Sequence, residues 1–597
     1  MGLLASPARG ALALVAASVA LCLALCWWQG ESVMVWGEET MVHSMPAPVV
    51  LGATPDAEGR PRREPSCKEP DAPWLVLSDS RPRLTMCAGG RSWPVMVAPY
   101  FAGFFYWPFA LFSSLHHDNV LVLRKLGLVF ALASILLTYR VVSRFAGRRV
   151  AALGALSTAV APCFILLHSA LVHFETLPWI FLMLALLVFS ACPGLAPPRR
   201  TSPGEDAGAT RAGEIPTRLL VLGSFLVGCA IIANLKTVIL IAPILLVALR
   251  LRVPAARIGA RRFALMGLTL LVPLIPAIAL GFAPSGGYGD KSDGWQRTLL
   301  AHILEPQRIV PTTRDLVLLW SNVPVYLHPI TGTSRLNYAS AALASAALIF
   351  VLVDAARTLV RREGCAVTAA LGACIVSYAG MVMLLYESFP ANFTPLHTVY
   401  SLSIAVALAR LGERLAPTGE RAWRLAPIAL AALLPFAWDT VDTIRAVTET
   451  RLPTNTRTEL AVVAYLVAQA EPSTVHLTVD SQLAGVVDSL SDGRVRTTQA
   501  ESFLRSCNPY RDNPEAEGCV TGRWKKLLPS LGSGAVRVIM PADFAAWGSR
   551  HIDMSLPLQR GADEAGYSLS LERSFPAGQG APGIVVYRAT PRSLSAN

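Results

Sequence analysis

Apolar segments about as long as a lipid bilayer is thick recur along this chain, and they limit its possible folds more than any other feature. A helix needs about 20 predominantly apolar residues to cross the hydrocarbon core of a membrane. Such segments lie near residues 11–29, 121–142, 150–168, 176–194, 218–235, 237–251, 263–283, 338–358, 366–386, 394–411 and 424–443. Charged residues make up only 15% of the 597 residues, against about 25% in a typical soluble protein. The sequence therefore predicts a polytopic α-helical membrane protein with about 11 transmembrane helices.

Arginine residues in the short connections indicate how these segments are oriented. If the N-terminus is cytoplasmic, every connection that falls inside the cell is basic, and short basic loops stay on the cytoplasmic side. The arginines concerned are Arg140, Arg144, Arg148 and Arg149; Arg199, Arg200 and Arg211; Arg252, Arg257, Arg261 and Arg262; Arg357, Arg361 and Arg362; and Arg410, Arg414, Arg421 and Arg424. The net charge of +12 is thus a topology signal and not a sign of nucleic-acid binding. The first segment exceeds a signal-peptide core of about 7–15 residues, so we expect an uncleaved anchor.

This orientation puts a long first loop, about residues 30–120, and the C-terminal segment outside the cytoplasm. We divide the chain into a transmembrane domain, residues 1–446, and an extracytoplasmic domain, residues 447–597. Within the first loop, residues 96–115 are apolar and rich in aromatic residues, which suit the membrane–water boundary. They are interpreted as an interfacial or re-entrant helix pair. The expected location is the inner or plasma membrane of a bacterium.

Four cysteines fall in the segments expected outside the cytoplasm. Cys67 and Cys87 lie in the first loop, and Cys507 and Cys519 lie in the C-terminal segment. Two pairs in outer segments predict two disulfides in an oxidising compartment, and the alternative is four unpaired thiols. Their spacing does not match a zinc site.

From about residue 448 the long apolar runs stop, and short helical and strand patterns alternate. The expected helices are 459–470, 482–490 and 524–531, and the expected strands are 474–479, 535–541, 567–575 and 583–587. Strands that alternate with helices are typical of an α/β domain. The segment has neither a glycine-rich phosphate loop nor a nucleophile elbow, so a supporting or acceptor-binding role is expected.

Acidic residues recur at the predicted outer ends of the apolar segments. Glu38 and Glu39 follow the first segment, and Glu175 lies in a very short turn between two others. Ionisable groups beside membrane segments often mark function, although each could also be a solvated turn residue. A carboxylate here could take a proton from an acceptor hydroxyl, while its neighbour orients a partner or a metal. His168 and His173 are interpreted as helix-end polar groups, with His173 kept as a secondary site candidate.

Cationic residues stand at the same predicted face of the membrane. Lys236 separates two short apolar segments at their outer ends, and Arg124 opens another segment. A lysine ammonium suits an anionic lipid phosphate, although both side chains could simply extend into the interface. Glu387 and His397 flank a turn at this face and are further secondary candidates.

Four stretches of this sequence resemble the polytopic GT-C glycosyltransferases. The resemblance is to the family 39-like group, which includes protein mannosyltransferases and the aminoarabinose transferase of lipid A. The stretches are Glu38-Glu39-Thr40; Arg91-Ser92-Trp93-Pro94 with Tyr100 to Gly103 and Pro108; Arg124, Arg148-Arg149, Pro162 and Glu175 in that order; and Asn234-Leu235-Lys236-Thr237 followed by Pro243. Together they lie within about residues 10–250. Two positions depart from the family pattern, because Glu38 stands where Asp is usual and Thr237 where Gly is frequent.

The resemblance implies a polyprenyl-phosphate sugar as donor and a lipid, glycan or protein acceptor on the outer face. In the implied inverting reaction, Glu38 or Glu39 is the base and Glu175 orients the sugar or the acceptor. Lys236, with Arg124, neutralises the phosphate. No cofactor is assigned, no metal ligands are named, and use of a divalent metal is left open.

Two other classes of protein share some of these features. A lipid or solute transporter or flippase also needs polar groups near its helices, but such proteins commonly carry internal repeats, and this sequence shows no clear one. A non-catalytic assembly or sensor protein would work through its C-terminal segment alone.

Overall fold

The structure is a computed structural model of the whole chain, in which part of the sequence is described. The described residues are 7–29, 75–77, 84–88, 91–98, 101–107, 120–161, 164–165, 168, 176–192, 216–234, 237–250, 258–281, 335–361, 365–385, 394–415, 433–435, 437–439, 441, 456–471, 474–479, 481–491, 494–495, 497–500, 504, 507, 513–532, 534–542, 552–576 and 583–592.

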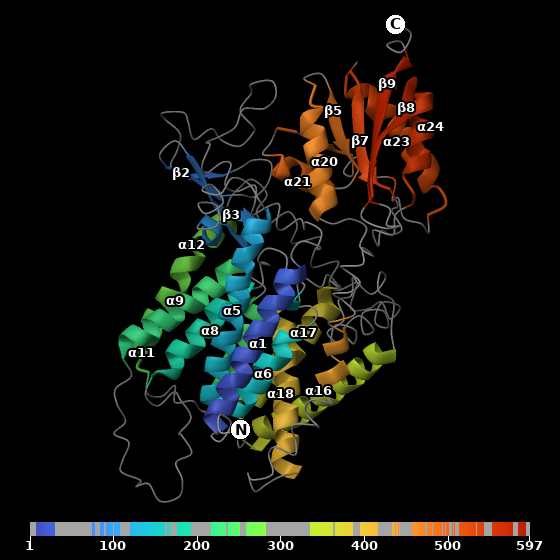
Figure 1. Cartoon of the computed structure of the whole chain (residues 1–597). Coiled ribbons are helices and arrows are strands. Elements are labelled where there is room, and N and C mark those ends of the chain that lie inside the picture. Colours follow the sequence, from blue (N-terminus) through green and yellow to red (C-terminus); the bar gives the residue numbers. More distant parts are fainter. Residues whose placement is uncertain are drawn as a thin grey trace, which may run out of the picture.

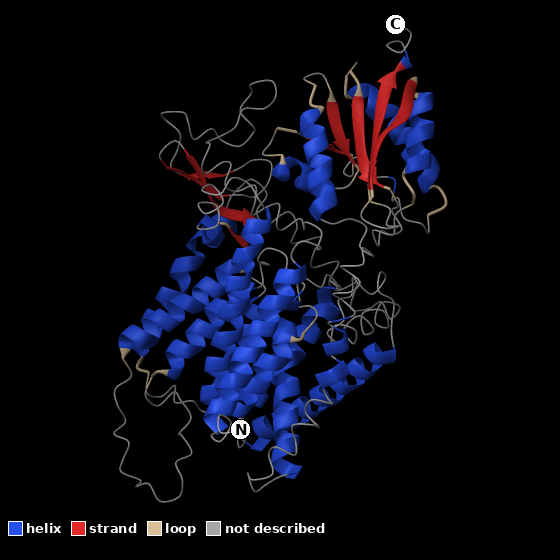
Figure 2. Cartoon of the chain, in the orientation of Figure 1, coloured by secondary structure: helices blue, strands red, loops and turns tan. Residues whose placement is uncertain are grey.

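The first part of the chain forms a bundle of apolar helices (Figures 1 and 2). They are α1 (Pro7–Gln29), α5 (Val120–Phe145), α6 (Arg148–Ala159), α8 (Thr176–Ser190), α9 (Thr217–Ala233), α10 (Val238–Arg250), α11 (Ala260–Leu271), the short η5 (Val272–Leu274), α12 (Ile275–Gly281), α16 (Arg335–Arg361), α17 (Ala366–Leu385) and α18 (Thr394–Leu415). Within the described residues, 4 helices are long and apolar enough to cross a membrane, and five further apolar helices are shorter. These helices make the chain an integral membrane protein.

Two of the predicted segments differ from the observed helices. The segment 150–168 is not one continuous helix, because α6 ends at Ala159 and residues 160–161 are not helical. Pro162 follows directly, and a proline disfavours helical geometry in the residue before it. Of the last predicted segment, 424–443, only residues 433–435, 437–439 and 441 are among those described.

Packing of small residues and a few polar contacts join the helices. Gly147, with φ of 90°, forms the tight connection between α5 and α6, a left-handed conformation that glycine adopts without strain. A Cβ at Gly154 of α6 would lie 2.7 Å from the Leu402 side chain of α18, so glycine permits close approach there. Trp179 Nε1 donates to Thr138 Oγ1 at 3.0 Å, which links α8 to α5 inside the bundle.

A small antiparallel sheet covers one end of the bundle. Its strands are β1 (Leu75–Leu77), β2 (Leu84–Ala88), β3 (Arg91–Ala98) and β4 (Phe101–Ala102), in that order, followed by one 3-10 turn, η2 (Phe104–Tyr106). Met96 and Ala102 pack with Ile232 of α9, beside Ala277 of α12. Figure 1 shows β3 and α12 at the end of the bundle opposite the start of α1.

The predicted helix pair over residues 96–115 is wrong where the structure describes it. Residues 96–98 and 101–102 are strand, and the helical residues described are those of η2 and Trp107. The alternation of residues 91–98 and the pairing of β3 with β2 explain this, since Met96 lies opposite Leu84 and both are buried. The Gly89–Gly90 pair between these strands is a hairpin signal. Residues 108–115 lie outside the described residues.

The C-terminal part contains a second, larger sheet. Its elements are α20 (Thr456–Ala468), β5 (Val475–Thr478), α21 (Ser481–Leu490), β6 (Thr497–Gln499), α23 (Ala516–Ser530), β7 (Val536–Pro541), α24 (Ser555–Glu564), β8 (Tyr567–Phe575) and β9 (Ile584–Pro591). The strand order is β6-β5-β7-β9-β8, with β6, β5 and β7 parallel and β9 antiparallel to both of its neighbours. Figure 2 shows helices on both sides of this sheet. We call these residues, 456–592, the C-terminal unit.

Both disulfide predictions concern cysteines outside the helical bundle. Cys507 and Cys519 form a disulfide, which confirms that prediction. Cys87 in β2 is also disulfide-bonded. Cys67, its predicted partner, lies outside the described residues, so the pairing itself stays a prediction.

Two apolar cores fill the two faces of the C-terminal sheet. Trp524 and Leu528 of α23 pack with Val538 of β7 on one face. On the other face, Val463 of α20 packs with Ile539, the next residue of β7. Every residue of β7 is buried, as expected for a central strand covered on both sides.

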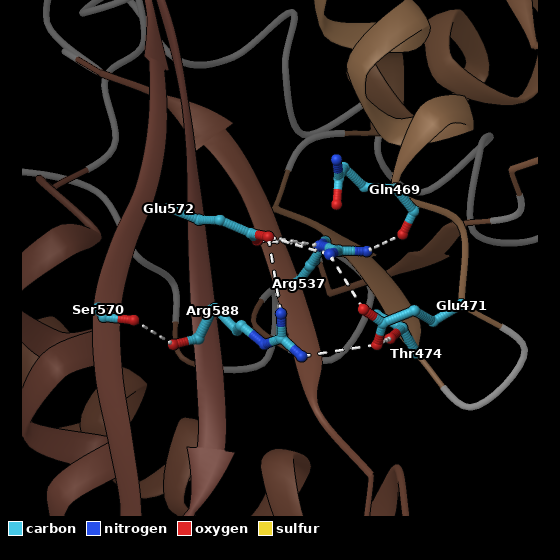
Figure 3. Close-up of polar contacts among 7 residues, drawn as sticks. All are labelled: Gln469, Glu471, Thr474, Arg537, Ser570, Glu572 and Arg588. Carbon is cyan, nitrogen blue, oxygen red and sulfur yellow. Dashed lines mark hydrogen bonds and ion pairs between the residues drawn. The ribbon is translucent and has the colours of Figure 1, made fainter.

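A charged cluster is built into the second of these faces (Figure 3). Arg537 on β7 is 0% exposed. Its Nε and Nη2 donate to the two Glu572 carboxylate oxygens at 2.9 Å each, and its Nη1 donates to the Gln469 carbonyl at 2.6 Å. Arg588 lies directly across from Arg537 on β9, and Glu471 bridges the two guanidinium groups at 4.0 and 3.5 Å. Two arginines directly opposite one another would repel. The carboxylates of Glu471 and Glu572 offset this repulsion.

A β-bulge in β8 places Glu572 in this cluster. The pairing of β8 with β9 shifts between Leu571 and Arg573, so Glu572 is the extra residue of a bulge. A bulge turns a side chain away from its regular alternation. Burial opposes the charge of Glu572, but its hydrogen bonds to Arg537 lower the pKa of this carboxyl overall.

His476 of β5 is buried beside this cluster. It lies opposite Arg537 in the sheet and is 6% exposed. Burial and the positive charge of Arg537 lower the pKa of His476 to about 4, against a smaller opposing effect of Glu572. The imidazole is therefore neutral in the folded chain at neutral pH.

Removing the carboxylate of Glu572 is expected to destabilise the C-terminal unit. In Glu572→Ala, Arg537 stays buried and faces Arg588 with less compensation, and breaking such a buried pair costs about 3–5 kcal/mol. We expect the unfolding free energy of the C-terminal unit to fall by about 3 kcal/mol, measured by denaturant titration of the full chain in detergent with hydrogen exchange as the readout. The matched control is Glu517→Ala, which breaks the exposed pair of Glu517 and Arg560 and should cost less than about 1 kcal/mol. Equal losses in both variants would contradict the structural role of the cluster.

Acid is expected to destabilise the C-terminal unit through His476. The unfolded chain binds a proton at His476 near pH 6.5, whereas the folded chain resists protonation down to about 4. The stabilisation is thus fully present above pH 6.5 and is lost as the pH falls toward 4, by about 2–4 kcal/mol in total. Denaturant titrations of the full chain across this range would measure the slope. His476→Gln should flatten it, and an unchanged slope would exclude His476 as its source.

Candidate functional site

Most of the predicted site residues lie outside the described residues. These are Glu38, Glu39, His173, Glu175, Lys236 and Glu387. The backbone of His397 belongs to α18, but its side chain is not described. Arg124 is described in full, and it is buried at 3% exposure near the start of α5. The described neighbours of the other residues show which ends of the helices meet.

The end of α1 meets the start of α5. Lys125 Nζ lies 5.0 Å from the centre of the Trp27 ring, a cation–π contact between the two helices. Glu38 and Glu39 follow Trp27 in the sequence by 11 and 12 residues. Trp27, near the end of α1, therefore lies beside Lys125, the residue that follows Arg124.

The same end of α1 also meets the chain after α6. The Cys26 thiol donates to the Ile165 carbonyl at 3.7 Å. The Phe164 ring is 4.0 Å from the His168 ring, centre to centre. Phe164 and Ile165, which precede Glu175 in the sequence, are thus packed against the last turns of α1.

A buried hydrogen-bonded pair ties this segment to the start of α8. His168 Nδ1 donates to the Phe164 carbonyl at 2.7 Å, and Thr176 Oγ1 lies 3.3 Å from His168 Nε2. His168 is 1% exposed and Thr176 is 2% exposed. Thr176 directly follows Glu175 in the chain, so this contact anchors the end of the turn that carries the predicted acid.

The junction of α9 and α10 lies at this end too. Asn234 and Thr237 flank the undescribed Leu235 and Lys236, and both are buried. The Thr237 amide donates to the Asn234 carbonyl at 2.9 Å, which holds the end of α9 and the start of α10 together. Ile232, two residues before Asn234, packs under the small sheet.

The small sheet links this junction to the start of α8. Phe105 of η2, the 3-10 turn that follows β4, contacts Phe181 of α8 with ring centres 4.8 Å apart. A continuous series of contacts therefore joins the end of α1, the starts of α5 and α8, and the α9–α10 junction. We call this region the sheet end of the bundle.

The structure adds two features that the sequence did not reveal. His168 was interpreted as a helix-end polar group, but it makes a specific buried contact with Thr176. The contact of Lys125 with Trp27 was not predicted at all. One sequence signal pointed to the contact of His168 with Thr176, since the two residues lie on either side of the turn expected around Glu175. Among the described residues, no group of three His, Cys, Asp or Glu side chains is placed to hold a metal ion.

No family model matches this sequence, and no curated protein matches it. Among solved structures, the chain is similar to the oligosaccharyltransferase of Archaeoglobus fulgidus in complex with zinc and sulfate, at 14% identity and a TM-score of 0.47, over 88% of this chain and 67% of that one. It is also similar to AglB of the same organism in complex with an inhibitory peptide and a dolichol-phosphate, at 14% identity and a TM-score of 0.49, over 94% and 72%. A third is ArnT from Cupriavidus metallidurans bound to undecaprenyl phosphate, at 13% identity and a TM-score of 0.46, over 96% and 97%.

These proteins are GT-C fold glycosyltransferases, the type of enzyme that the sequence resembles. Identities of 13–14% and TM-scores below 0.5 describe a similar arrangement of the chain and nothing finer. We therefore base the function on the residues of this chain.

Proposed function

We propose that this chain is a membrane glycosyltransferase that moves a sugar from a polyprenyl-phosphate carrier to an acceptor on the outer face of the membrane. The observation that supports this most is the meeting of helix ends at the sheet end of the bundle. Described residues that flank Glu38 and Glu39, Glu175 and Lys236 in the sequence, namely Trp27, Thr176 and Ile232, all belong to this region. Acids and cations gathered at one membrane face suit a reaction between a lipid phosphate and a hydroxyl.

In the proposed reaction, the acceptor oxygen attacks the anomeric carbon of the sugar in a single displacement. The bond from this carbon to the phosphate oxygen breaks, and its electron pair leaves on the carrier phosphate. Glu38 or Glu39 takes the proton of the attacking hydroxyl, as a general base. One displacement inverts the configuration of the anomeric carbon. Glu175 orients the sugar or the acceptor.

The leaving phosphate gains negative charge in this reaction, and cations that meet this charge lower the barrier. Lys236 is proposed to pair with it, together with the Arg124 guanidinium, which can donate two parallel hydrogen bonds to a phosphate. The hydroxyl of Thr237 is buried and has no hydrogen-bond partner within the described part of the chain. It can serve as a further donor to the phosphate beside Lys236.

The remaining parts of the chain have supporting roles in this proposal. Residues 1–446 form the transferase domain, and residues 447–597 form a domain outside the cytoplasm that helps to bind the acceptor. His173, Glu387 and His397 are secondary candidates for contacts with the sugar.

Replacement of the acidic pair tests the base. In Glu38→Gln or Glu39→Gln, the residue that accepts the proton can no longer do so, and turnover is expected to fall by about 10²–10⁴-fold. Transfer is measured with polyprenyl-phosphate-linked sugars extracted from the source cells, at equal levels of purified protein. Glu564→Gln, at an exposed residue of the C-terminal unit, is the matched control. Full activity of both variants would remove the pair from the mechanism.

Replacement of Lys236 tests the phosphate contact. A hydrogen bond to a charged group contributes about 1.5–3 kcal/mol, so Lys236→Gln should lower kcat/KM for the lipid-linked donor by about 10–100-fold. Lys125→Gln, at an exposed lysine of the same end, should leave kcat/KM within a few-fold of its original value.

Mass spectrometry of lipid-linked sugars and surface glycans, with and without the gene, identifies the sugar. Movement of the carrier lipid without any new glycosidic bond would instead indicate a flippase.

A further inference from the structure

We infer that His168 and Thr176 form a buried clamp that positions Glu175 for sugar transfer. This inference rests on the proposed function, and it assigns a positioning role to two residues that do not themselves contact the substrate.

The hydrogen bonds fix the state of the His168 ring. The Phe164 carbonyl can only accept, so the 2.7 Å contact requires a proton on Nδ1. A neutral ring then presents Nε2 as an acceptor, and the Thr176 hydroxyl donates to it at 3.3 Å. Because both side chains are almost fully buried, water does not compete for these bonds. Both hydrogen bonds form when His168 carries its proton on Nδ1 and the Thr176 hydroxyl points toward Nε2.

The clamp fixes the residue that directly follows Glu175 in the chain. His168 and Thr176 are eight residues apart, and His173 and Glu175 lie between them in the sequence. The Cα atoms of consecutive residues are about 3.8 Å apart. Fixing Thr176 therefore restricts where the backbone of Glu175 can lie.

Both sides of the clamp are attached to rigid parts of the bundle. Three residues after Thr176, Trp179 Nε1 donates to Thr138 Oγ1 of α5. On the other side, the segment of Phe164 and Ile165 packs against α1, where Cys26 donates to the Ile165 carbonyl. A side chain held on rigid elements keeps its position better than one on a free loop.

The Thr176 hydroxyl differs from other buried hydroxyls of the bundle. Thr158 of α6 and Ser403 of α18 donate to the carbonyl four residues earlier in their own helices. Thr176 is the first residue of α8, so its helix offers no such carbonyl. Its hydroxyl instead reaches across the loop to His168. The contact therefore adds a link between two segments, which an intrahelical bond does not.

The test is a double-mutant cycle on the full-length protein in detergent. Thr176→Val keeps the shape of the side chain and removes the hydroxyl. If the clamp positions Glu175, kcat falls by about ten- to a hundredfold, while KM for the polyprenyl-phosphate-linked sugar fraction stays within about twofold. In the Glu175→Gln background, the same replacement should cause no further loss, because the group to be positioned is already absent.

Conservative variants and a matched control separate positioning from folding. Thr176→Ser keeps the hydroxyl and should retain activity. His168→Gln can place an acceptor near the position of Nε2 and should retain more activity than His168→Asn, which can replace only Nδ1. Thr158→Val is the matched control, since it removes an equally buried hydroxyl that bonds only within α6. It should leave kcat unchanged.

A second measurement does not depend on activity. Amide hydrogen exchange of residues 169–179 should become faster in Thr176→Val and stay unchanged in Thr158→Val. Unchanged exchange in Thr176→Val would overturn the clamp. Equal losses of kcat with and without Glu175 would overturn its positioning role and leave the proposed function intact. If the unaltered protein transfers no sugar, or if Glu175→Gln is fully active, the assignment of Glu175 fails and the inference fails with it.

Discussion

The absence of water inside a membrane governs the arrangement of this chain. Backbone groups in hydrocarbon must bond within their own segment, which makes helices the available element. Ionised side chains are costly at the same depth. Two contacts inside the bundle accordingly join uncharged polar groups, Trp179 with Thr138 and His168 with Thr176. Charged chemistry is restricted to the ends of the helices, and the order of the helices decides which ends meet.

Meeting of helix ends is therefore the central fact of the proposed site. No single helix carries it, because α1, α5, α8 and the α9–α10 junction each contribute one end. The small sheet and the η2 turn after it link α8 to α9 through Phe105 and Met96. This division of work resembles that of many enzymes, in which a rigid scaffold holds loops that carry the reacting groups. In the proposed site, the membrane helices are the scaffold, and the proposed reacting groups belong to the connections between them.

The sequence predicts correctly those helices and strands whose pattern of apolar residues lies within one short segment. The strand expected over residues 567–575 is found at Tyr567–Phe575, and the helix expected over 366–386 is found at Ala366–Leu385. It failed for residues 96–102, because an aromatic, apolar stretch can equally be an interfacial helix or a strand until its partner is known. The sequence also did not predict the strand order of the C-terminal sheet. In that order β5 lies between β6 and β7, and both pairings join residues that are far apart in the sequence.

For the candidate site, the sequence supplied residue types and their side of the membrane. Glu38, Glu39, Glu175 and Lys236 remain predictions, because they lie outside the described residues. The structure supplied the burial of Arg124 and the contact of His168 with Thr176. Neither could be read from local patterns, because both depend on how separate helices pack.

The bulge in β8 has a consequence beyond the charged cluster that it completes. β8 is the outermost strand of its sheet, and an outermost strand with free backbone groups is a template for pairing with another molecule. At Glu572 the register of β8 is interrupted, and the next residue, Arg573, places its guanidinium 5.0 Å from the centre of the Tyr465 ring. An irregular, charged border of this kind is a poor template for a further strand. The same displaced residue that neutralises Arg537 thus also protects the sheet from edge-to-edge aggregation.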